Sequence, residues 1–505
     1  MTKAVHYIWR CFIGSAVAFC FTSSALAAKP AKMATDIPAG IPIPNELKTP
    51  LGTLTFDDGR PDQATVQKLY DNLDFQRGVQ AFLNTTMAGS MAAMRDGLRG
   101  VGAGNDGFVL FETLTNARSL FLTANTDTVY AMSWADTREG PVVIEVPSNV
   151  LFLVDDALQK YVGDMGNAGP DKGKGGKYVL LPPGYTGEVP EGYFVLRSPT
   201  YGNWIGGRGF VLNGDPRATA EHMKRSLRIY PLAKVNAPPP THFVNGSGKA
   251  FNTVHSNDLR FFHEIDSVVQ HEPQEAFDAE TRGLLAAIGI RKGTPFNPDA
   301  RMKKILNEAA LVGAATARAL VFETRNPDAY FYPSSDWRTA FIGGSHEFSP
   351  GGTLDLDARA QFAYTATGIT PAMAKKMVGV GSQYAYASHD AKKQLLDGGK
   401  NYVIRMPAGI PAKNFWSLTT YDTQTRSYLQ TDQDFPSISS ARGEIVTNSD
   451  GSVDVHFGPK PPTGNASNWI QTMPGQGWFV MLRLYGPLQP WFDKTWQPGE
   501  ITEVK

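Results

Sequence analysis

The sequence predicts a mainly β protein with a helical insert: two β-sandwich regions separated by helices. Charged residues make up only 19% of the chain, whereas Gly (50), Pro (35) and aromatic residues (11%) are plentiful, which is typical of turn-rich β proteins. Short β-rich runs fill two stretches of the chain, and an Ala-rich helical stretch lies between them. Without its expected leader the chain has 478 residues, too many for a single hydrophobic core.

The first 27 residues have the pattern of a secretory leader. Lys3 and Arg10 precede an apolar run, and residues 25–27 (ALA) form a small-x-small cleavage signal. Cleavage after Ala27 removes both cysteines, so we expect a cysteine-free periplasmic or secreted protein without disulfides or zinc–thiolate sites. The alternative is that the apolar run stays as a membrane anchor, although it is short for a span.

The nearly neutral charge of the chain indicates which classes of binding partner to expect. Removal of Lys3 and Arg10 leaves 46 basic and 48 acidic residues, a formal charge of −2, with no basic block. Nucleic acid is therefore not an expected partner. We expect no membrane span after the leader, and exposed strand edges with many aromatic residues favour a homodimer.

Residues 28–107 are predicted to be an extended lead-in followed by a helix over 62–99. The helix carries Met87, Met91 and Met94 at roughly helical spacing, a pattern that indicates core packing rather than a cofactor site. Residues 108–240 are predicted to be a β-sandwich, ending at the linker 238–240 (PPP). The expected strands are 108–111, 119–123, 141–146, 177–181, 193–197 and 209–212.

Residues 241–385 are predicted to be mostly helical, with helices over 257–270, 298–323 and 355–367. Residues 325–352 form a long aromatic loop. The expected buried stripe of the second helix is Ile305, Leu306, Ala309, Val312 and Leu320. Residues 386–505 return to strands, expected over 402–406, 414–421, 452–457 and 478–485.

Two ordered sets of motifs carry a resemblance to a known family. The N-terminal set is residues 124–130 (ANTDTVY), 140–147, 182–190, 197–200 and 205–208. The C-terminal set is residues 415–419 (FWSLT) with 421–422, then 450–452, 468–469 and 483–487. The chain resembles a bacterial exported two-domain family that joins domain of unknown function 1254 to domain of unknown function 1214.

This resemblance covers nearly the whole mature chain. It implies an immunoglobulin-like N-terminal sandwich, a central helical region and a C-terminal jelly-roll sandwich, but it implies little about activity. Residues 270–273 (QHEP) depart from the Asn-Pro-Pro-like turn expected there.

Several common catalytic motifs are missing from the sequence. There is no Gly-x-Ser-x-Gly, no Walker A sequence and no His-Glu-x-x-His. Residues 102–107 (GAGNDG) follow a helix and precede a strand, the wrong order for a dinucleotide site. His255, His263 and His271 are eight residues apart, which rotates them by about 80° on a helix, so we predict no metal site there. The sequence identifies no cofactor.

The best candidate site is the cluster of Asn125, Asp127, Thr128 and Tyr130, with Asp127 and Tyr130 as candidate catalytic residues and Asn125 and Thr128 as candidate substrate-binding residues. Asp127 is a candidate to orient Tyr130 or accept a proton from a substrate. The alternative is structural, because Asn, Asp and Thr side chains satisfy backbone groups in tight turns. Thr128, Tyr130 and Trp134 share one face of a regular strand, and this face is a candidate pocket lining.

Two arginines are candidate anion-binding residues. Arg483 lies in mid-strand on one face with Tyr485, where a cation needs a buried carboxylate or an anionic ligand. Arg208 also needs an anionic partner, and the preceding Gly206 and Gly207 permit a ligand or another backbone segment to approach the strand closely. A structural ion pair is the alternative for both arginines.

Three aromatic residues complete the candidate ligand-binding set. Tyr421 and Trp416 lie on opposite faces of a second strand. Trp337 in the aromatic loop is a candidate lid over a pocket between the domains.

We expect an exported enzyme, hydrolytic in type, that acts on a small or amphiphilic substrate in a cleft between β domains. Asp127 and Tyr130 would supply acid–base chemistry, and Arg208 or Arg483 would hold an anionic group. The alternatives are a non-catalytic envelope protein that binds carbohydrate or lipid and a structural envelope component, since sandwich folds host both binding and catalysis.

Overall fold

The computed structural model describes residues 32–504 except 212–213, 444 and 465–466, so the predicted leader lies outside the described residues. The chain divides into two compact units, residues 1–69 and 70–505. In the first unit, part of the stretch predicted as an extended lead-in is instead an antiparallel sheet. Its strands are β1 (Glu46–Thr49), β2 (Gly52–Asp57) and β3 (Arg60–Pro61). Gly52 and Gly59 have positive φ angles of 91° and 78°, so these glycines mark hairpin turns.

The second unit contains two pairs of packed sheets. The first pair is a six-stranded sheet, ordered β14-β4-β6-β12-β8-β9, and a four-stranded sheet, ordered β11-β10-β7-β13. Both sheets contribute to one buried apolar core. The strands are β4 (Gly107–Leu110), β6 (Thr128–Asp136), β7 (Val142–Val146), β8 (Val150–Asp156), β9 (Tyr161–Gly166), β10 (Gly176–Leu181), β11 (Phe194–Arg197), β12 (Gly202–Phe210), β13 (Arg228–Pro231) and β14 (His242–Asn245).

The C-terminal pair consists of two four-stranded sheets, ordered β16-β22-β18-β19 and β21-β20-β17-β23, which share a second apolar core. The strands are β16 (Ser382–Ala387), β17 (Asn401–Met406), β18 (Ala412–Asp422), β19 (Ser437–Ser439), β20 (Val453–Gly458), β21 (Trp469–Gln471), β22 (Trp478–Pro487) and β23 (Thr502–Val504). A two-stranded sheet of β5 (Ser119–Leu120) and β15 (Phe251–Asn252) completes the β structure of the unit.

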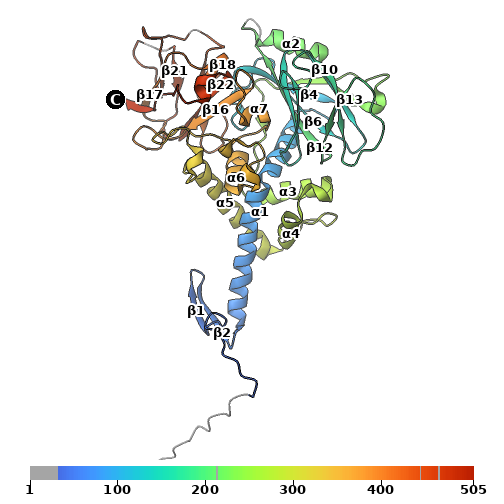
Figure 1. Ribbon diagram of the computed structural model, residues 1–505, viewed down its shortest axis with the longest axis vertical. Helices are drawn as coiled ribbons and strands as arrows, with labels where there is room; N and C mark the ends of the chain where they lie inside the picture. Colours follow the sequence, from blue (N-terminus) through green and yellow to red (C-terminus); the bar gives the residue numbers. More distant parts are fainter. Residues whose placement is uncertain (1–31, 212–213, 444, 465–466, 505) are drawn as a thin grey trace, which may run out of the picture. The chain divides into compact units, whose positions relative to one another are not determined.

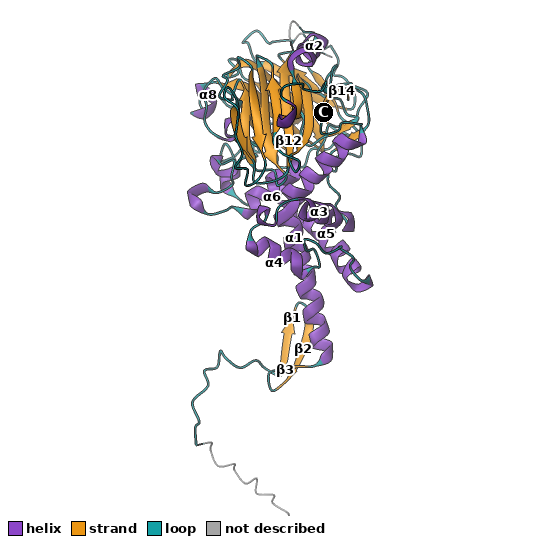
Figure 2. Ribbon diagram, turned by 90° about the vertical axis from the view of Figure 1, so that its right-hand side faces the viewer, coloured by secondary structure: helices purple, strands orange, loops and turns teal. Residues whose placement is uncertain are grey.

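The long helices of this unit gather at one end of the strands (Figures 1 and 2). They are α1 (Gln63–Gly100), which begins in the first unit, α3 (Leu259–His271), α4 (Ala279–Ala287), α5 (Ala300–Phe322) and α6 (Leu356–Thr365). Shorter helices are α2 (Pro216–Ser226), α7 (Pro371–Ala374) and α8 (Gln489–Phe492). The predicted methionine stripe of α1 is buried, which confirms its assignment to the core.

Helix α5 corrects two expectations. By length and composition alone it could cross a membrane, contrary to the expected absence of such a run. In the structure, however, it packs closely in the helical region: a Cβ added at Gly313 would come within 2.7 Å of the Phe82 ring. The buried stripe also differs from the prediction, since Val312 is 43% exposed. The buried residues are Leu306, Ala309, Ala310, Gly313, Ala314, Ala317 and Val321, because small side chains permit this close packing.

Most predicted strands are present, but several observed strands were not predicted: β8, β9, β13, β14, β16, β19, β21 and β23. Strands β8 and β9 contain Asp155, Asp156, Asp164 and two glycines, which are residue types that strands disfavour. The strand expected over 209–212 is the end of β12, which begins at Gly202. Parallel pairing of β14 with β4 also carries the first sheet beyond the linker at 238–240.

One face of the six-stranded sheet meets one face of the β16-β22-β18-β19 sheet. Tyr130 and Met132 of β6 belong to the same buried cluster as Tyr421 and Met481 of the C-terminal sheet. Hydrogen bonds cross this boundary, since Tyr421 Oη donates to the carbonyl oxygen of Ala124. The two sandwiches therefore share a buried interface within one compact unit.

Candidate functional site

A cavity of about 90 Å³ lies at the interface between these two sheets. The volume is enough for several water molecules or for a small organic molecule, but not for a long acyl chain. Its wall is mostly apolar, with a few polar groups from both sandwiches and from the helical region. Residues of the lining include Tyr130, Leu153, Asp164, Trp204, Gly206, Arg208, Phe341, Phe362, Thr370, Met373, Tyr384, Met481 and Arg483.

Arg208 reaches the cavity from β12. Its position is opposite Tyr130 of β6 in the antiparallel register, so both side chains leave the sheet on the same face. Gly206 precedes it on that face, and a Cβ there would lie 2.6 Å from the Trp204 ring. Glycine thus leaves room for the indole over the backbone. The Arg208 guanidinium lies beside the hydroxyl of Tyr384 and forms no ion pair with any described carboxylate.

Arg483 enters the cavity from β22 of the other sandwich and is only 2% exposed. Its Nη2 donates to the carbonyl oxygens of Thr123 and Ala124, the latter at 3.2 Å. Its Nη1 has no hydrogen-bond partner, and its guanidinium lies 5.8 Å from the centre of the Tyr384 ring. No described carboxylate pairs with it. The structural ion pair considered for each arginine is therefore not seen in the described part of the chain.

Two phenols add neutral donors near these cations. Tyr130 Oη accepts hydrogen bonds from Asn125 Nδ2 at 2.8 Å and from the Asn125 backbone N–H at 3.2 Å, so its own proton is free to be donated. Tyr485 is 1% exposed, its hydroxyl has no hydrogen-bond partner among the described residues, and it lies near both arginines without lining the cavity. Burial raises the pKa of Tyr130 and of Tyr485 above the ordinary value, so both hydroxyls are protonated at neutral pH.

The cluster at residues 125–130 is a turn that positions Tyr130. Asn125 Oδ1 accepts from the backbone N–H of Asp127 at 2.9 Å and from the Thr128 N–H and Oγ1 at 3.0 and 2.9 Å. Asp127 is 1% exposed, does not line the cavity, and forms an ion pair at 3.1 Å with Arg442 Nε of the C-terminal region. The arrangement favours the structural alternative for Asn125, Asp127 and Thr128.

The predicted aromatic residues take different places. Trp134 is buried in the cluster that contains Tyr130 but does not line the cavity. Trp337 and Trp416 belong to the core of the C-terminal sandwich, so Trp337 is not a lid. Its indole N–H donates to the carbonyl oxygen of Gly499 at 3.0 Å. Another residue of the same loop, Phe341, does line the cavity.

Asp164 is the carboxylate among the described lining residues, and it was not predicted because strand β9 was not predicted. It belongs to the cavity face, since it lies opposite Leu153 in the β8–β9 register and both residues line the cavity. Its Oδ2 accepts hydrogen bonds from Tyr161 Oη at 3.1 Å and from Thr370 Oγ1 at 2.7 Å. Burial raises the pKa of Asp164 to about 6.

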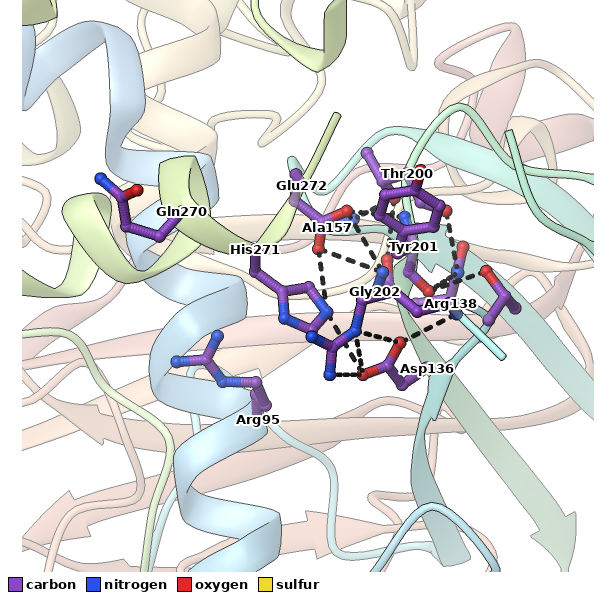
Figure 3. Close-up of polar contacts among 12 residues, drawn as sticks. Arg95, Asp136, Arg138, Ala157, Thr200, Tyr201, Gly202, Gln270, His271 and Glu272 are labelled. Carbon is purple, nitrogen blue, oxygen red and sulfur yellow. Dashed lines mark hydrogen bonds and ion pairs between the residues drawn. The ribbon is translucent and has the colours of Figure 1, made fainter. Parts of the chain in front are cut away.

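A separate polar cluster surrounds the C-terminal end of α3 (Figure 3). Glu272 is buried and accepts hydrogen bonds from the backbone N–H groups of Tyr201 and Gly202, at 2.6 and 3.1 Å. Asp136 of β6 pairs with Arg138 at 2.7 Å and with His271 at 3.3 Å. Burial raises the pKa of Glu272 to about 7. The contacts of Glu272 with Tyr201 and Gly202 and of His271 with Asp136 tie the end of α3 to the six-stranded sheet.

The predicted histidine series does not converge on a metal site. His255 is buried among aromatic rings, and burial lowers its pKa to about 3. Over the residues that the structure describes, no three His, Cys, Asp or Glu side chains gather as a metal centre requires.

Comparisons with known proteins agree with the predicted domain order. Residues 106–231 match the family model DUF1254 and residues 381–489 match DUF1214, both described as proteins of unknown function. No curated protein matches the chain.

A crystal structure of a protein from Vibrio parahaemolyticus is similar in fold, with a TM-score of 0.53 and 19% identity over 86% of this chain and 100% of that one. A putative uncharacterised protein from Burkholderia cenocepacia has a TM-score of 0.42 and 13% identity, over 88% of this chain and 97% of that one.

Proposed function

We propose that the protein binds a small carboxylate in the cavity between its two sandwiches. The observation that carries this proposal is that Arg208 and Arg483, from different sandwiches, line one cavity while neither pairs with a described carboxylate. A guanidinium keeps its charge at any physiological pH, and a buried charge without a counter-charge is costly. An anionic ligand supplies the missing counter-charge.

The remaining lining fits a carboxylate that carries a short hydrocarbon part. Tyr130 offers a neutral hydroxyl donor beside the cations, and planar guanidinium groups match the planar carboxylate. The apolar walls, among them Leu153, Phe341 and Met373, suit a short hydrocarbon part. The small volume of the cavity excludes long fatty acids and most oligosaccharides.

Hydrolysis at this cavity is a second candidate function. Asp164 supports it, because a buried carboxyl with a pKa of about 6 suits proton transfer at neutral pH. Asp127, the acid–base residue expected from the sequence, lies outside the lining. Binding is therefore the better supported role, and screening esters and amides of the bound acid would test for turnover.

The binding proposal is tested by thermal shift and calorimetry with straight-chain monocarboxylates from acetate to octanoate. We expect binding by short acids, weaker binding of longer acids, and loss of binding in Arg208→Met and Arg483→Met. Arg405→Met is the matched control, because Arg405 is an exposed arginine that pairs with Asp454 on the other C-terminal sheet. Equal binding by the wild type and the Arg208→Met variant would refute the proposal.

We also propose that the chain is exported, by cleavage after Ala27, and acts in the periplasm or outside the cell. The n-region, apolar run and small-x-small signal support this. N-terminal sequencing of protein recovered from the periplasm of a bacterial host would test it, and light scattering of the same material would test the expected homodimer.

The finer strand connections are likewise a proposal. The family resemblance supports an immunoglobulin-like topology for the first sandwich and a jelly roll for the second. The eight strands of the described C-terminal sheets fit a jelly roll. An experimental structure with traced connections would test both.

A further inference from the structure

The cavity has a second polar end, formed by Asp164 of β9. Along β12, Arg208 lies two residues from Gly206, and Gly206 is opposite Leu153 of β8, which is opposite Asp164. The Cα atoms of Arg208 and Asp164 are therefore about 12 Å apart, because two residues along a strand and two strand spacings across the sheet separate them. The cations and the carboxylate thus share one face and one cavity without forming an ion pair.

One oxygen of Asp164 remains available. Tyr161 and Thr370 both donate to Oδ2, whereas no described residue donates a hydrogen bond to Oδ1. No described lysine or arginine lies within ion-pair distance, although Arg208 acts on Asp164 through its longer-range field. Among the described residues, Asp164 therefore has no cationic partner, just as Arg208 and Arg483 have no anionic one.

The wall between the two ends is largely apolar. Trp204, Phe341, Phe362 and Met373 are part of it. A ligand that reaches both ends would carry one polar group toward the arginines, a second toward Asp164, and a short apolar segment against this wall.

We propose that the ligand of this cavity is a small zwitterion, whose carboxylate contacts Arg208 and Arg483 and whose ammonium group contacts Asp164. This inference rests on the proposed function and names the substrate class of the same site. A short ω-amino acid supplies both missing counter-charges. A simple monocarboxylate supplies one and leaves the Asp164 carboxylate desolvated and without a cation.

Calorimetry with four matched probes tests the proposal: valerate, δ-aminovalerate, δ-hydroxyvalerate and pentylamine. At about pH 7.5 we expect wild-type protein to bind δ-aminovalerate at least tenfold more tightly than valerate, and pentylamine weakly. Asp164→Asn keeps the shape of the side chain and an oxygen for Tyr161 and Thr370. In this variant we expect the preference for the amino acid to disappear while valerate affinity is kept or improved.

A pH change provides the same test without a mutation. The groups that face Asp164 are Tyr161 on its own strand, Asp155 on β8 and Arg208 on β12. Since burial raises the pKa of Asp164 to about 6, its protonated form predominates at about pH 5.5. We therefore expect the preference for δ-aminovalerate over valerate to fall at this pH in the wild type.

The outcomes separate the two proposals. If valerate binds and the amino group adds nothing, the zwitterion is refuted and the carboxylate site stands. Equal gains from δ-hydroxyvalerate and δ-aminovalerate would also refute the zwitterion, since a neutral donor would then suffice. If none of the carboxylates binds, the proposed function itself fails. A preference for δ-aminovalerate that Asp164→Asn retains would place the ammonium elsewhere and overturn the assignment.

Discussion

Replacement of Arg208 by methionine separates binding from stability at the cavity. Methionine keeps most of the apolar stem of the side chain and removes the charge. Arg208 has no carboxylate partner in the described structure, and its guanidinium lies 5.8 Å from the centre of the Tyr485 ring. In the protein without ligand, the substitution has two opposing effects on stability. Loss of the weak cation–π contact lowers stability, and removal of an unpaired, partly buried charge raises it.

The expected magnitudes follow from these contacts. Without ligand, Arg208→Met should have a melting temperature equal to the wild type or up to about 3 °C higher, because relief of the buried charge outweighs the lost contact. A hydrogen bond to a charged group contributes about 1.5–3 kcal/mol, so carboxylate affinity should fall roughly 10- to 150-fold.

Differential scanning fluorimetry with and without valerate, together with calorimetry, measures both quantities. The control Arg405→Met should keep the wild-type affinity, since its exposed ion pair contributes at most about 1 kcal/mol. A melting temperature of Arg208→Met more than about 3 °C below the wild type without ligand would show that Arg208 stabilises the fold, and valerate binding within twofold of the wild type would show that it does not hold the carboxylate.

Four further variants test the remaining arguments. Asp127→Asn should lower the free energy of unfolding by about 2–4 kcal/mol in chemical denaturation, because it leaves Arg442 without its carboxylate partner. Valerate affinity measured by calorimetry should stay unchanged. A loss of affinity at full stability would instead support the acid–base role of Asp127. Tyr130→Phe should weaken valerate binding about threefold to tenfold by calorimetry and lower stability by about 1 kcal/mol, since Asn125 loses its acceptor. Gly206→Ala should displace the Trp204 ring, costing about 1–3 kcal/mol in denaturation and weakening binding; wild-type values for both would show that the ring adapts. Glu272→Gln tests the link between protonation and stability. Burial raises the pKa of Glu272 from 4.5 in the unfolded chain to about 7 in the folded protein, so the wild type should lose stability as the pH rises from about 4.5 to 7. Melting curves of the variant should show a smaller loss over that range.

The sequence predicted much of the fold because its signals are local. The helix over 62–99 and four strands of the C-terminal sandwich, β17, β18, β20 and β22, were found within a few residues, since apolar periodicity and turn residues are visible in short windows. The short strands β19, β21 and β23, and β16 at the end of the region predicted to be helical, were not predicted. Strands β8 and β9 were missed, because Asp155 and Asp164 are stabilised by partners elsewhere in the chain, namely Ile369 N–H and Thr370 Oγ1.

The candidate site could be predicted only in part. Tyr130, Arg208 and Arg483 were identified because a polar residue stands out in an apolar strand, and all three line the cavity. Asp127 stood out for the same reason, but it serves an ion pair with Arg442 that is distant in sequence. A pattern in one strand shows that a polar group needs a partner, and it does not show which partner.

The sequence by itself determined the alternation of strands and helices, the faces that the side chains share and the family resemblance, because these depend on neighbouring residues along the chain. Only the tertiary structure decided which faces meet. It placed two arginines from strands about 275 residues apart in one cavity, with no carboxylate partner among the described residues, and put Asp164 at the other end. Counter-charge and cavity shape arise from contacts between distant segments, so they become visible only when the sheets pack.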